Sequence, residues 1–333
     1  MKVIRAATEL AAGRKVCLAI GVFDGVHLGH QQIIRQTVAD ARQHDGVSVV
    51  VTFDRHPNAI VAPSRVPPMI YSLPQKLRTI ESLGPDELLL IHFSEAFSQQ
   101  TGEVFIRQLA RDLSSGGARL CEPQQLRDNE PAAGHRPALQ NCLQSICVGA
   151  DFTFGHKRSG DVKLLQRLGT ELKFTVHGMA AVALDGQPVS STRIREAVRA
   201  CDLDAAGQML GRAYSVAGRI IHGDQLGHKL GFPTANIDTA DLLLPPNGVY
   251  AAHADVAGKN FRAVLNIGHR PTVKSPTPEL RVEVHLLDFA GDLYGQELEI
   301  TFAAKLRDEQ KFASLDELKA QIARDIAEAR LRF

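Results

Sequence analysis

The first half of the chain alternates short apolar runs with segments of helical periodicity. The runs are rich in Val, Ile and Leu, as strands buried on both faces should be. They lie at Val16–Ile20, Val47–Phe53, Glu87–Phe93, Ser145–Val148 and Leu172–Val176. Between them, apolar residues recur at helical spacing around Ile34, Leu77 and Val104. Strands that alternate with helices in this rhythm form βαβ units. The pattern predicts an α/β domain with a parallel sheet over residues 1–210.

The pattern changes near Tyr214. Helical periodicity over Ile194–Leu210 gives way to apolar residues at every second position, as in Val282, Val284 and Leu286 and again in Leu298, Ile300 and Phe302. Antiparallel strands with one buried face have this period, and a closed barrel leaves them no open edge. A final helix is marked by the capping-box pair Ser314 and Glu317 and by an apolar stripe of Leu315, Leu318, Ile322 and Ile326. We therefore expect residues 211–333 to form a β-barrel with a terminal helix.

One long segment fits neither pattern. Residues Cys121–Gln144 are rich in Gln, Pro and Arg and have no apolar period. This composition is typical of a long polar loop. We interpret it as an insertion, with a lid over a site as the alternative.

Composition excludes several classes of protein. The 333 residues include 38 basic and 37 acidic side chains, a net charge of +1 that gives no support for a nucleic-acid or membrane partner. No apolar run approaches the roughly 20 residues of a membrane span, and the charged first ten residues lack the apolar stretch of a secretory signal. Five scattered cysteines without a C-x-x-C pair favour free thiols. We expect a cytoplasmic protein, either a monomer or a weak homo-oligomer.

A glycine- and histidine-rich motif, G-V-F-D-G-V-H-L-G-H, follows the first long strand at Gly21–His30. Its glycines let backbone approach a ligand closely, and the helix that follows offers free N–H groups to a phosphate. His27 and His30 are three residues apart, so both imidazoles can face that phosphate on the first helical turn. Each feature alone also fits a metal pair or surface residues. The whole string resembles the H-x-G-H motif of the nucleotidylyltransferase superfamily, which binds a nucleotide triphosphate.

A second motif, V-S-S-T-R-I-R, occupies Val189–Arg195. Hydroxyl groups at a helix start and the guanidinium groups of Arg193 and Arg195 would suit phosphates, although an ordinary helix cap explains the motif equally well. Together with the first motif it resembles the flavin-adenylylating branch of that superfamily. The resemblance implies a Rossmann-like domain. It also implies ATP contacts from Gly21, Phe23, Asp24, Gly25, Gly29, Ser190, Ser191, Thr192 and Arg193, with His27 and His30 as catalytic residues.

Two further segments, T-F-D-R-H-P and V-G-A-D-F-T-F-G, follow predicted strands at Thr52–Pro57 and Val148–Gly155. Open α/β sheets bind ligands at the carboxyl ends of their strands. Within the resemblance, the expected flavin contacts are Phe53, His56, Asp151 and Phe152. Ordinary core packing is the alternative for the phenylalanines.

The barrel domain opens with a different motif, I-I-H-G-D-Q-L-G-H-K-L-G-F-P-T-A-N, at Ile220–Asn236. Glycines spaced by four give a turn able to close on phosphates, and Thr234 and Asn236 project oxygen ligands to one side of a strand. Such oxygens suit one Mg²⁺ bound with ATP, whereas a simple turn is the alternative. The motif resembles that of the riboflavin kinase family. The expected ATP contacts are Gly223, Gly227, Lys229, Gly231, Pro233, Thr234 and Asn236, of which Thr234 and Asn236 would hold the Mg²⁺.

Later segments match the same family in order, among them R-V-E-V-H-L-L-D-F-A-G-D-L-Y-G at Arg281–Gly295 and L-R-D-E-Q-K-F at Leu306–Phe312. Glu283 occupies the family's catalytic-base position, where it would accept a proton from an alcohol attacking ATP. Without the resemblance it would be interpreted as a solvated strand residue. Flavin contacts are expected from Arg307, Glu309 and Phe312.

Both halves together resemble the bacterial bifunctional riboflavin kinase/FMN adenylyltransferase family. The resemblance implies a six-stranded antiparallel barrel and two ATP-dependent steps, from riboflavin to FMN with ADP released and from FMN to FAD with pyrophosphate released. Four residues depart from the family pattern: Val22, Arg55, Ala150 and Thr153. They concern the adenylylation half. A cytidylyltransferase-like enzyme and a flavin-binding regulator without catalysis are the rival hypotheses, which incubation with CTP or ATP separates.

Overall fold

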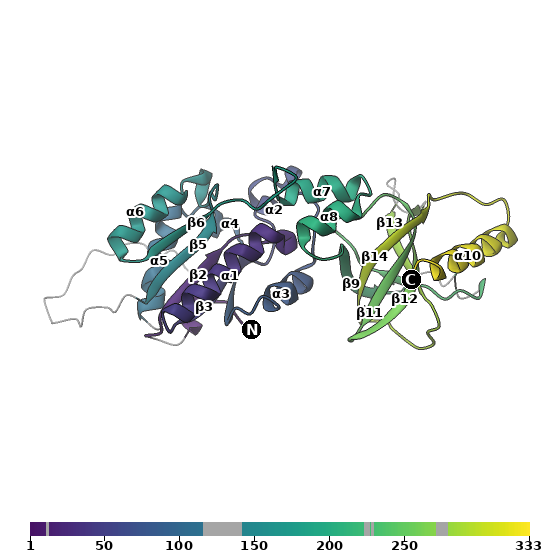
Figure 1. Cartoon of the computed structure of the whole chain (residues 1–333), viewed down its shortest axis with the longest axis horizontal. Coiled ribbons are helices and arrows are strands. Elements are labelled where there is room, and N and C mark those ends of the chain that lie inside the picture. The colour runs from purple at the N-terminus through teal and green to yellow at the C-terminus, as the bar shows by residue number, and fades with distance from the viewer. Residues whose placement is uncertain (11–12, 116–141, 223–226, 228–229, 271–278) are drawn as a thin grey trace, which may run out of the picture. The chain divides into compact units, whose positions relative to one another are not determined.

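The computed structural model describes residues 1–10, 13–115, 142–222, 227, 230–270 and 279–333 (Figure 1). Contacts divide the chain into two compact units. Unit 1 consists of Met1–Pro67 and Lys76–Val189, and unit 2 consists of Pro68–Gln75 and Ser190–Phe333. The division at residues 210 and 211 remains a prediction. The insertion predicted at Cys121–Gln144 lies outside the described residues except for its last three positions.

Unit 1 is built on a six-stranded parallel sheet, as the alternation of strands and helices predicts. Its strand order is β1-β4-β3-β2-β5-β6, and all neighbouring strands are parallel. The strands are β1 (Lys2–Ile4), β2 (Val16–Ile20), β3 (Val47–Phe53), β4 (Glu87–Ile91), β5 (Leu143–Gly149) and β6 (Thr175–Met179). The strand predicted at Leu172–Val176 is misplaced, because Leu172 ends a helix with strong amphipathic periodicity. Strand β1, only three residues long, was not predicted.

Helices cover both faces of this sheet. They are α1 (Leu28–Gln43), α2 (Asn58–Val61), α3 (Leu73–Glu81), α4 (Glu95–Ser98), α5 (Gly102–Ser115) and α6 (Val162–Leu172). Short 3-10 turns lie at Ala7–Glu9, Asp24–Val26, Pro63–Arg65 and His156–Arg158. The hairpin strands β7 (Ala183–Leu184) and β8 (Gln187–Pro188) complete the unit.

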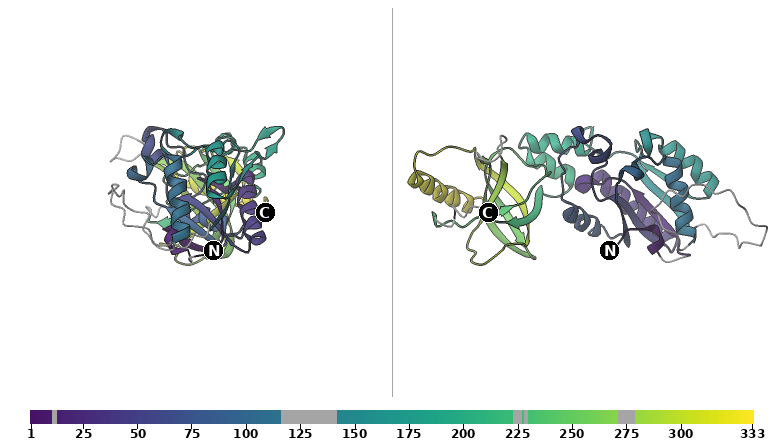
Figure 2. Two further views of the ribbon diagram at one scale, coloured as in Figure 1. Left: turned by 90° about the vertical axis from the view of Figure 1, so that its left-hand side faces the viewer. Right: turned by 180° about the vertical axis from the view of Figure 1, so that it is seen from behind.

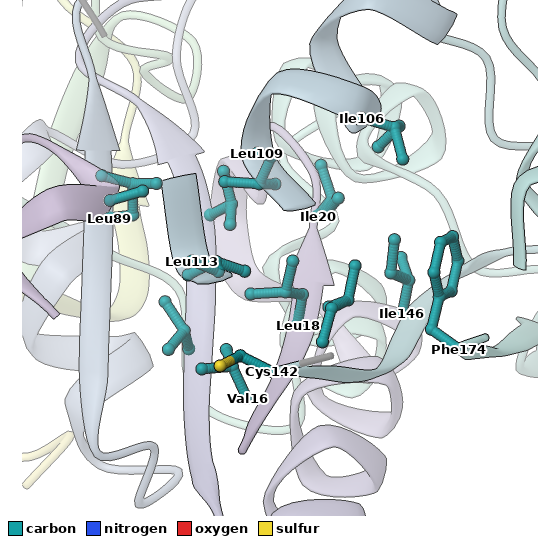
Figure 3. Close-up of a cluster of buried hydrophobic side chains, with 14 of the residues drawn as sticks. Val16, Leu18, Ile20, Leu89, Ile106, Leu109, Leu113, Cys142, Ile146 and Phe174 are labelled. Atoms are coloured by element: carbon teal, nitrogen blue, oxygen red, sulfur yellow. The ribbon is translucent and has the colours of Figure 1, made fainter. Parts of the chain in front are cut away.

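The core of unit 1 lies between the sheet and α5. Alternate residues of β2, Val16, Leu18 and Ile20, meet the apolar face of α5, including Leu109 and Leu113, in one buried cluster (Figure 3). Side chains alternate along a strand, so the residues between them face the opposite layer. This packing fixes the carboxyl end of β2, where the glycine–histidine motif begins.

Unit 2 contains a closed antiparallel barrel with the strand order β10-β13-β12-β11-β14-β9. The predicted six-stranded barrel with a terminal helix is therefore confirmed (Figure 2). The strands are β9 (Ser215–Ile221), β10 (Ala235–Ile237), β11 (Gly248–Val256), β12 (Lys259–Arg270), β13 (Glu279–Leu286) and β14 (Glu297–Arg307). The alternation in the sequence marks the buried face, since Val282, Val284, Leu298 and Ile300 are fully buried.

Outside the barrel, the described part of unit 2 includes the helices α7 (Ser191–Arg199), α8 (Leu203–Leu210) and α10 (Leu315–Arg330). Helix α10 lies beside the barrel (Figures 1 and 2). Ser314 caps it as predicted, accepting a hydrogen bond from the Glu317 backbone N–H at 3.2 Å. The predicted apolar stripe is wrong at Leu315, which is 60% exposed, because this first-turn residue points away from the barrel. No helix among the described residues has the length and apolar character to cross a membrane.

Candidate active sites

The glycine–histidine motif folds into a tight turn at the carboxyl end of β2. The Gly21 N–H donates to the Val51 carbonyl of β3 at 3.1 Å, which continues the sheet hydrogen bonding by one residue. The chain then reverses through left-handed backbone angles at Phe23 (φ 52°) and Gly25 (φ 76°). A phenylalanine in this conformation is strained, and the fully buried Phe23 ring is what holds it there. After this turn, His27 lies at the start of α1.

His27 and His30 form a fixed pair rather than two independent side chains. His27 is the N-cap of α1, and its Nδ1 accepts from the His30 backbone N–H at 3.4 Å. The two imidazole rings stack with centroids 3.6 Å apart, and Phe23 meets His30 edge-on at 5.2 Å. Both rings therefore lie at the first turn of α1, whose N-terminal dipole favours an anion.

The electrostatics of the pair favour a neutral His30. Burial, followed by the neighbouring His27 and Lys76, holds the pKa of His30 well below 6.5. At neutral pH its ring therefore carries one N–H donor and one acceptor nitrogen. Its buried Nδ1 has no hydrogen-bond partner among the described residues.

A large cavity of about 710 Å³ opens beside this turn within unit 1. Phe53, His56 and Phe152, three of the four residues predicted to contact a flavin, line it together with Val22. Asp151, the fourth, is exposed and is not among the described residues that line the cavity. The predicted residues are thus brought together apart from this carboxylate.

Six phenylalanines contribute to the walls of this cavity. These rings contact one another in series, with the centroids of neighbouring rings at most 6.4 Å apart. The series runs through Phe53, Phe93, Phe97, Phe105, Phe154 and Phe152. Such surfaces suit a flat, apolar ring system. The sequence analysis missed Phe93, Phe97 and Phe105. The signal for Phe93 was available, because it ends the apolar run Glu87–Phe93 as Phe53 ends the run Val47–Phe53.

Two of the four departures from the family pattern line the same cavity. They are Val22 and Thr153. Arg55 is half-exposed and pairs with Asp54 at 3.5 Å. Ala150 is tied to the sheet through its backbone N–H, which donates to the Met179 carbonyl. None of the four closes the cavity.

The second phosphate motif, Ser190–Arg193, belongs to unit 2. Ser190 caps α7 and accepts from the Arg193 N–H at 3.3 Å, while Thr192 is exposed. Arg195 is instead buried, and its Nε donates to the Pro68 carbonyl at 2.9 Å. Its guanidinium group therefore holds the segment Pro68–Gln75, so the structure gives it a packing role that the sequence did not suggest.

The barrel holds a cavity of about 370 Å³ that contains Thr234, Asn236 and Glu283. In the sheet, Glu283 of β13 lies directly opposite Asn236 of β10 on one side and Asn266 of β12 on the other. Residues in register across neighbouring strands present their side chains to the same face. The three side chains thus form a polar row that lines the cavity, with Val282 and Val284 buried on the other face.

Asn236 and Thr234 have the character of ligands for a hard cation. The Asn236 side chain is 8% exposed, and its Oδ1 meets no donor in the part of the chain that the structure describes. A buried carbonyl oxygen without a partner is costly unless something satisfies it. Thr234 faces the same cavity, and its hydroxyl would lie 2.9 Å from a Cβ placed on Gly227. These oxygens fit Mg²⁺.

The two described glycines before β10 differ in their surroundings. A Cβ on Gly227 would collide with the Phe232 carbonyl, whereas a Cβ on Gly231 would meet open space and Gly231 instead has a left-handed φ of 87°. Pro233 and Thr234 also line a neighbouring cavity of about 550 Å³. The Pro233 carbonyl contacts His285 Nδ1 at 2.8 Å. Gly223 and Lys229, two predicted ATP contacts, lie outside the described residues.

The three predicted flavin contacts of the barrel, Arg307, Glu309 and Phe312, line the 370 Å³ cavity. Arg307 makes a bidentate pair with the buried Asp325 of α10, at 2.9 and 2.8 Å, and its third nitrogen donates to the Asp308 carbonyl. Its guanidinium group lies 5.8 Å from the Phe312 ring. Arg307 of β14 therefore connects the barrel to α10 through its ion pair with Asp325.

Known proteins match both regions. The riboflavin kinase family model matches residues 210–333, and the FAD synthetase model matches residues 10–115 and 139–193. The bifunctional riboflavin kinase/FMN adenylyltransferase of Pseudomonas fluorescens is 37% identical, covering 99% of this chain and 97% of its own. The corresponding protein of Escherichia coli K12 is also 37% identical, and the match covers 100% of this chain and 98% of that protein. The chain belongs to the bifunctional riboflavin kinase/FMN adenylyltransferase family.

A solved structure also matches along the whole chain. The structure titled as a macrolide-efflux protein from Streptococcus pneumoniae has a TM-score of 0.76, is 26% identical and covers 98% of both chains. The two family models separate the glycine–histidine turn from the polar row of the barrel, although the FAD synthetase match also includes Ser190–Arg193, which belong to unit 2. The FAD synthetase match contains the Gly21–His30 turn, and the riboflavin kinase match contains Glu283.

Asn266 is a functional candidate that the sequence analysis missed. It lies in the apolar segment around Leu265 and Ile267, and nothing in the sequence indicates which strand residue faces Glu283. The register of β12 against β13 supplies that information. Gly268, two residues later, leaves room for the Glu309 carboxylate, which a Cβ at that position would displace.

Proposed function

We propose that the two activities of the family are divided between the two cavities of this chain. Riboflavin kinase activity belongs to the barrel, and FMN adenylyltransferase activity belongs to the α/β unit. The observation that carries the assignment is the in-register row of Asn236, Glu283 and Asn266, which gives a carboxylate between two amides in the cavity of the riboflavin kinase match. ATP is the co-substrate at both sites.

In the kinase step, Glu283 acts as the general base. It accepts the proton of the primary alcohol of riboflavin as that oxygen forms a bond to the γ-phosphorus of ATP, and the bond to ADP breaks. Asn236 and Asn266 flank the carboxylate and restrict where it lies. Arg307, Glu309 and Phe312, which line the cavity, contact the flavin. The segment that contains Gly227 and Gly231 accommodates the ATP phosphates.

Thr234 and Asn236 would hold one Mg²⁺ through their side-chain oxygens. When bound, this ion neutralises charge on the phosphates of ATP. The proposal explains why the Asn236 Oδ1 is buried without a donor among the described residues.

In the adenylylation step, a phosphate oxygen of FMN bonds to the α-phosphorus of ATP, and pyrophosphate leaves. The N–H groups of the Gly21–His30 turn and of the first turn of α1 donate to the triphosphate, and His27 and His30 stabilise the charge that develops on it. The phenylalanine-lined cavity takes the isoalloxazine ring, through Phe53, His56 and Phe152. The phosphate contacts expected from Ser190, Ser191, Thr192 and Arg193 remain predictions from the sequence.

The direct test is to incubate the protein with riboflavin, ATP and Mg²⁺ and to separate the products by chromatography. FMN should form first, followed by FAD and pyrophosphate. Supplied FMN should give FAD with ATP and not with CTP. Unchanged riboflavin would contradict the kinase assignment, and a CTP-dependent product would favour a cytidylyltransferase. The cytoplasmic location and the oligomeric state remain predictions from the sequence.

A further inference from the structure

Lys76 is a buried cation beneath the glycine–histidine turn, and no motif in the sequence includes it. Its side chain is 2% exposed, in the first half of α3. The Nζ group donates to the Phe53 carbonyl at 2.8 Å, and to the Thr52 hydroxyl and the Val22 carbonyl at 3.4 Å each. An ammonium group has three donors, so these acceptors satisfy it completely.

These three acceptors come from the two strand ends that form the adenylylation site. Val22 belongs to the Gly21–His30 turn, whereas Thr52 and Phe53 end β3 at the wall of the aromatic cavity. The Thr52 hydroxyl also donates to the Val22 carbonyl at 3.1 Å. One ammonium group thus fixes the phosphate-binding turn relative to the flavin-binding wall. The departure at Val22 does not disturb this link, because it uses the backbone carbonyl.

The charged groups around Lys76 come from several elements. Asp24 of the turn and Asp54 after β3 favour its charged form, whereas burial opposes it and lowers the pKa of Lys76 to about 8. Asp54 is itself paired with His92 and Arg55. On α1, the charge of Lys76 contributes to keeping His30 neutral. At neutral pH the group is still mainly charged.

We propose that Lys76 is a positioning residue for adenylyl transfer, because its buried ammonium group holds the phosphate-binding turn against the end of β3 that carries the flavin contact Phe53. This inference rests on the proposed function of unit 1. The transferred α-phosphorus and the FMN phosphate must meet between these two segments, and a misplacement of about 1 Å there is able to cost about 100-fold in rate.

The test compares Lys76→Met and Lys76→Arg with the exposed lysine control Lys163→Met of α6. We expect Lys76→Met to lower kcat for FAD formation from FMN about 100-fold. Riboflavin phosphorylation in the same preparation should change less than twofold, which also shows that unit 2 is folded. Lys163→Met should leave both rates unchanged. A normal FAD rate in Lys76→Met would overturn the inference.

A pH profile separates positioning by charge from simple packing. In the wild type, kcat/KM for FMN should fall above about pH 8, as Lys76 loses its proton in the free enzyme. This alkaline limb should be absent from the residual activity of Lys76→Met and should move above pH 10 in Lys76→Arg, because a guanidinium group stays charged. If Lys76→Met does not fold, Lys76→Arg decides, and a limb that stays near pH 8 in that variant overturns the inference.

The experiment distinguishes failure of the proposed function from failure of the role of Lys76. A wild-type protein that makes no FAD from FMN would remove the adenylyltransferase assignment itself. A wild-type protein that makes FAD, together with variants that match it in rate and pH profile, would remove only the role of Lys76.

Discussion

The two proposed sites are assembled in contrasting ways. In unit 1 the glycine–histidine site comes from ten consecutive residues, at the point where one parallel strand turns into a helix. In the barrel, the proposed base Glu283 and the two amides that flank it come from three strands, β10, β13 and β12, and meet through their register. The first site is built mainly from backbone and a stacked histidine pair, and the second from a row of side chains.

The contrast reflects the geometry of the two sheets. Parallel strands all end at one edge, so a short segment there has a helix N-terminus and neighbouring strand ends within reach. Antiparallel barrel strands run in opposite directions, so a site on the barrel wall needs one residue from each of several strands. Substitutions at either site should therefore act on one activity and spare the other.

The largest effect should follow Glu283→Gln, which removes the base and preserves the shape of the side chain. We expect FMN formation from riboflavin to fall by about 10³-fold, within the range for loss of a general base. FAD formation from supplied FMN should be unchanged. Both rates are measured by chromatography of the products. Asp316→Asn, an exposed acid of α10, is the control and should alter neither rate. Normal kinase turnover in Glu283→Gln would remove Glu283 from the base role.

The reciprocal change is His30→Ala, which should lower FAD formation from FMN by about 10² to 10³-fold through loss of a donor to developing charge. Kinase turnover should stay at the wild-type level. Because His30 is held neutral, the wild-type adenylylation rate should show no acid limb near pH 6.5 from this residue. His44→Ala, at the other end of α1, is the matched control. Undiminished FAD synthesis would defeat the assignment of His30.

The same contrast explains what the sequence predicted. The Gly21–His30 turn could be located from its sequence motif because all of its residues are adjacent in the chain. The row around Glu283 could not, since Asn266 acquires its role only from the pairing of β12 with β13. Lys76 was also missed, because a single lysine in an amphipathic helix has no local signal that it is buried. Strand boundaries failed where helix and strand compete, as at Leu172.

A smaller effect, on stability, should come from the pair that joins α10 to the barrel. Asp325→Ala leaves Arg307 partly buried without its carboxylate, which should lower the free energy of unfolding of unit 2 by about 2–3 kcal/mol. The protein has no tryptophan, and its four tyrosines, Tyr71, Tyr214, Tyr250 and Tyr294, all belong to unit 2. Tyrosine fluorescence in urea therefore follows this unit alone.

The matched control for this pair is Asp288→Ala. Asp288 makes a bidentate pair with Arg330 of the same helix, at 3.0 and 2.7 Å, but it is 60% exposed. Exposed pairs contribute little because water screens them, so the urea midpoint should barely move. Equal shifts for the two variants would show that burial of the Arg307 pair is not what stabilises the barrel.

The smallest effect should come from Ser190→Ala, and it separates the two interpretations of the second phosphate motif. Loss of the N-cap should cost about 1 kcal/mol in either case. Only a phosphate contact predicts in addition that the KM for ATP in adenylyl transfer rises about tenfold. Ser314→Ala removes a nearly identical cap from α10, at 3.2 Å instead of 3.3 Å, and should leave that KM unchanged. If Ser190→Ala behaves like Ser314→Ala, Ser190 is a helix cap and the phosphate cradle of the adenylylation site lies entirely in the Gly21–His30 turn.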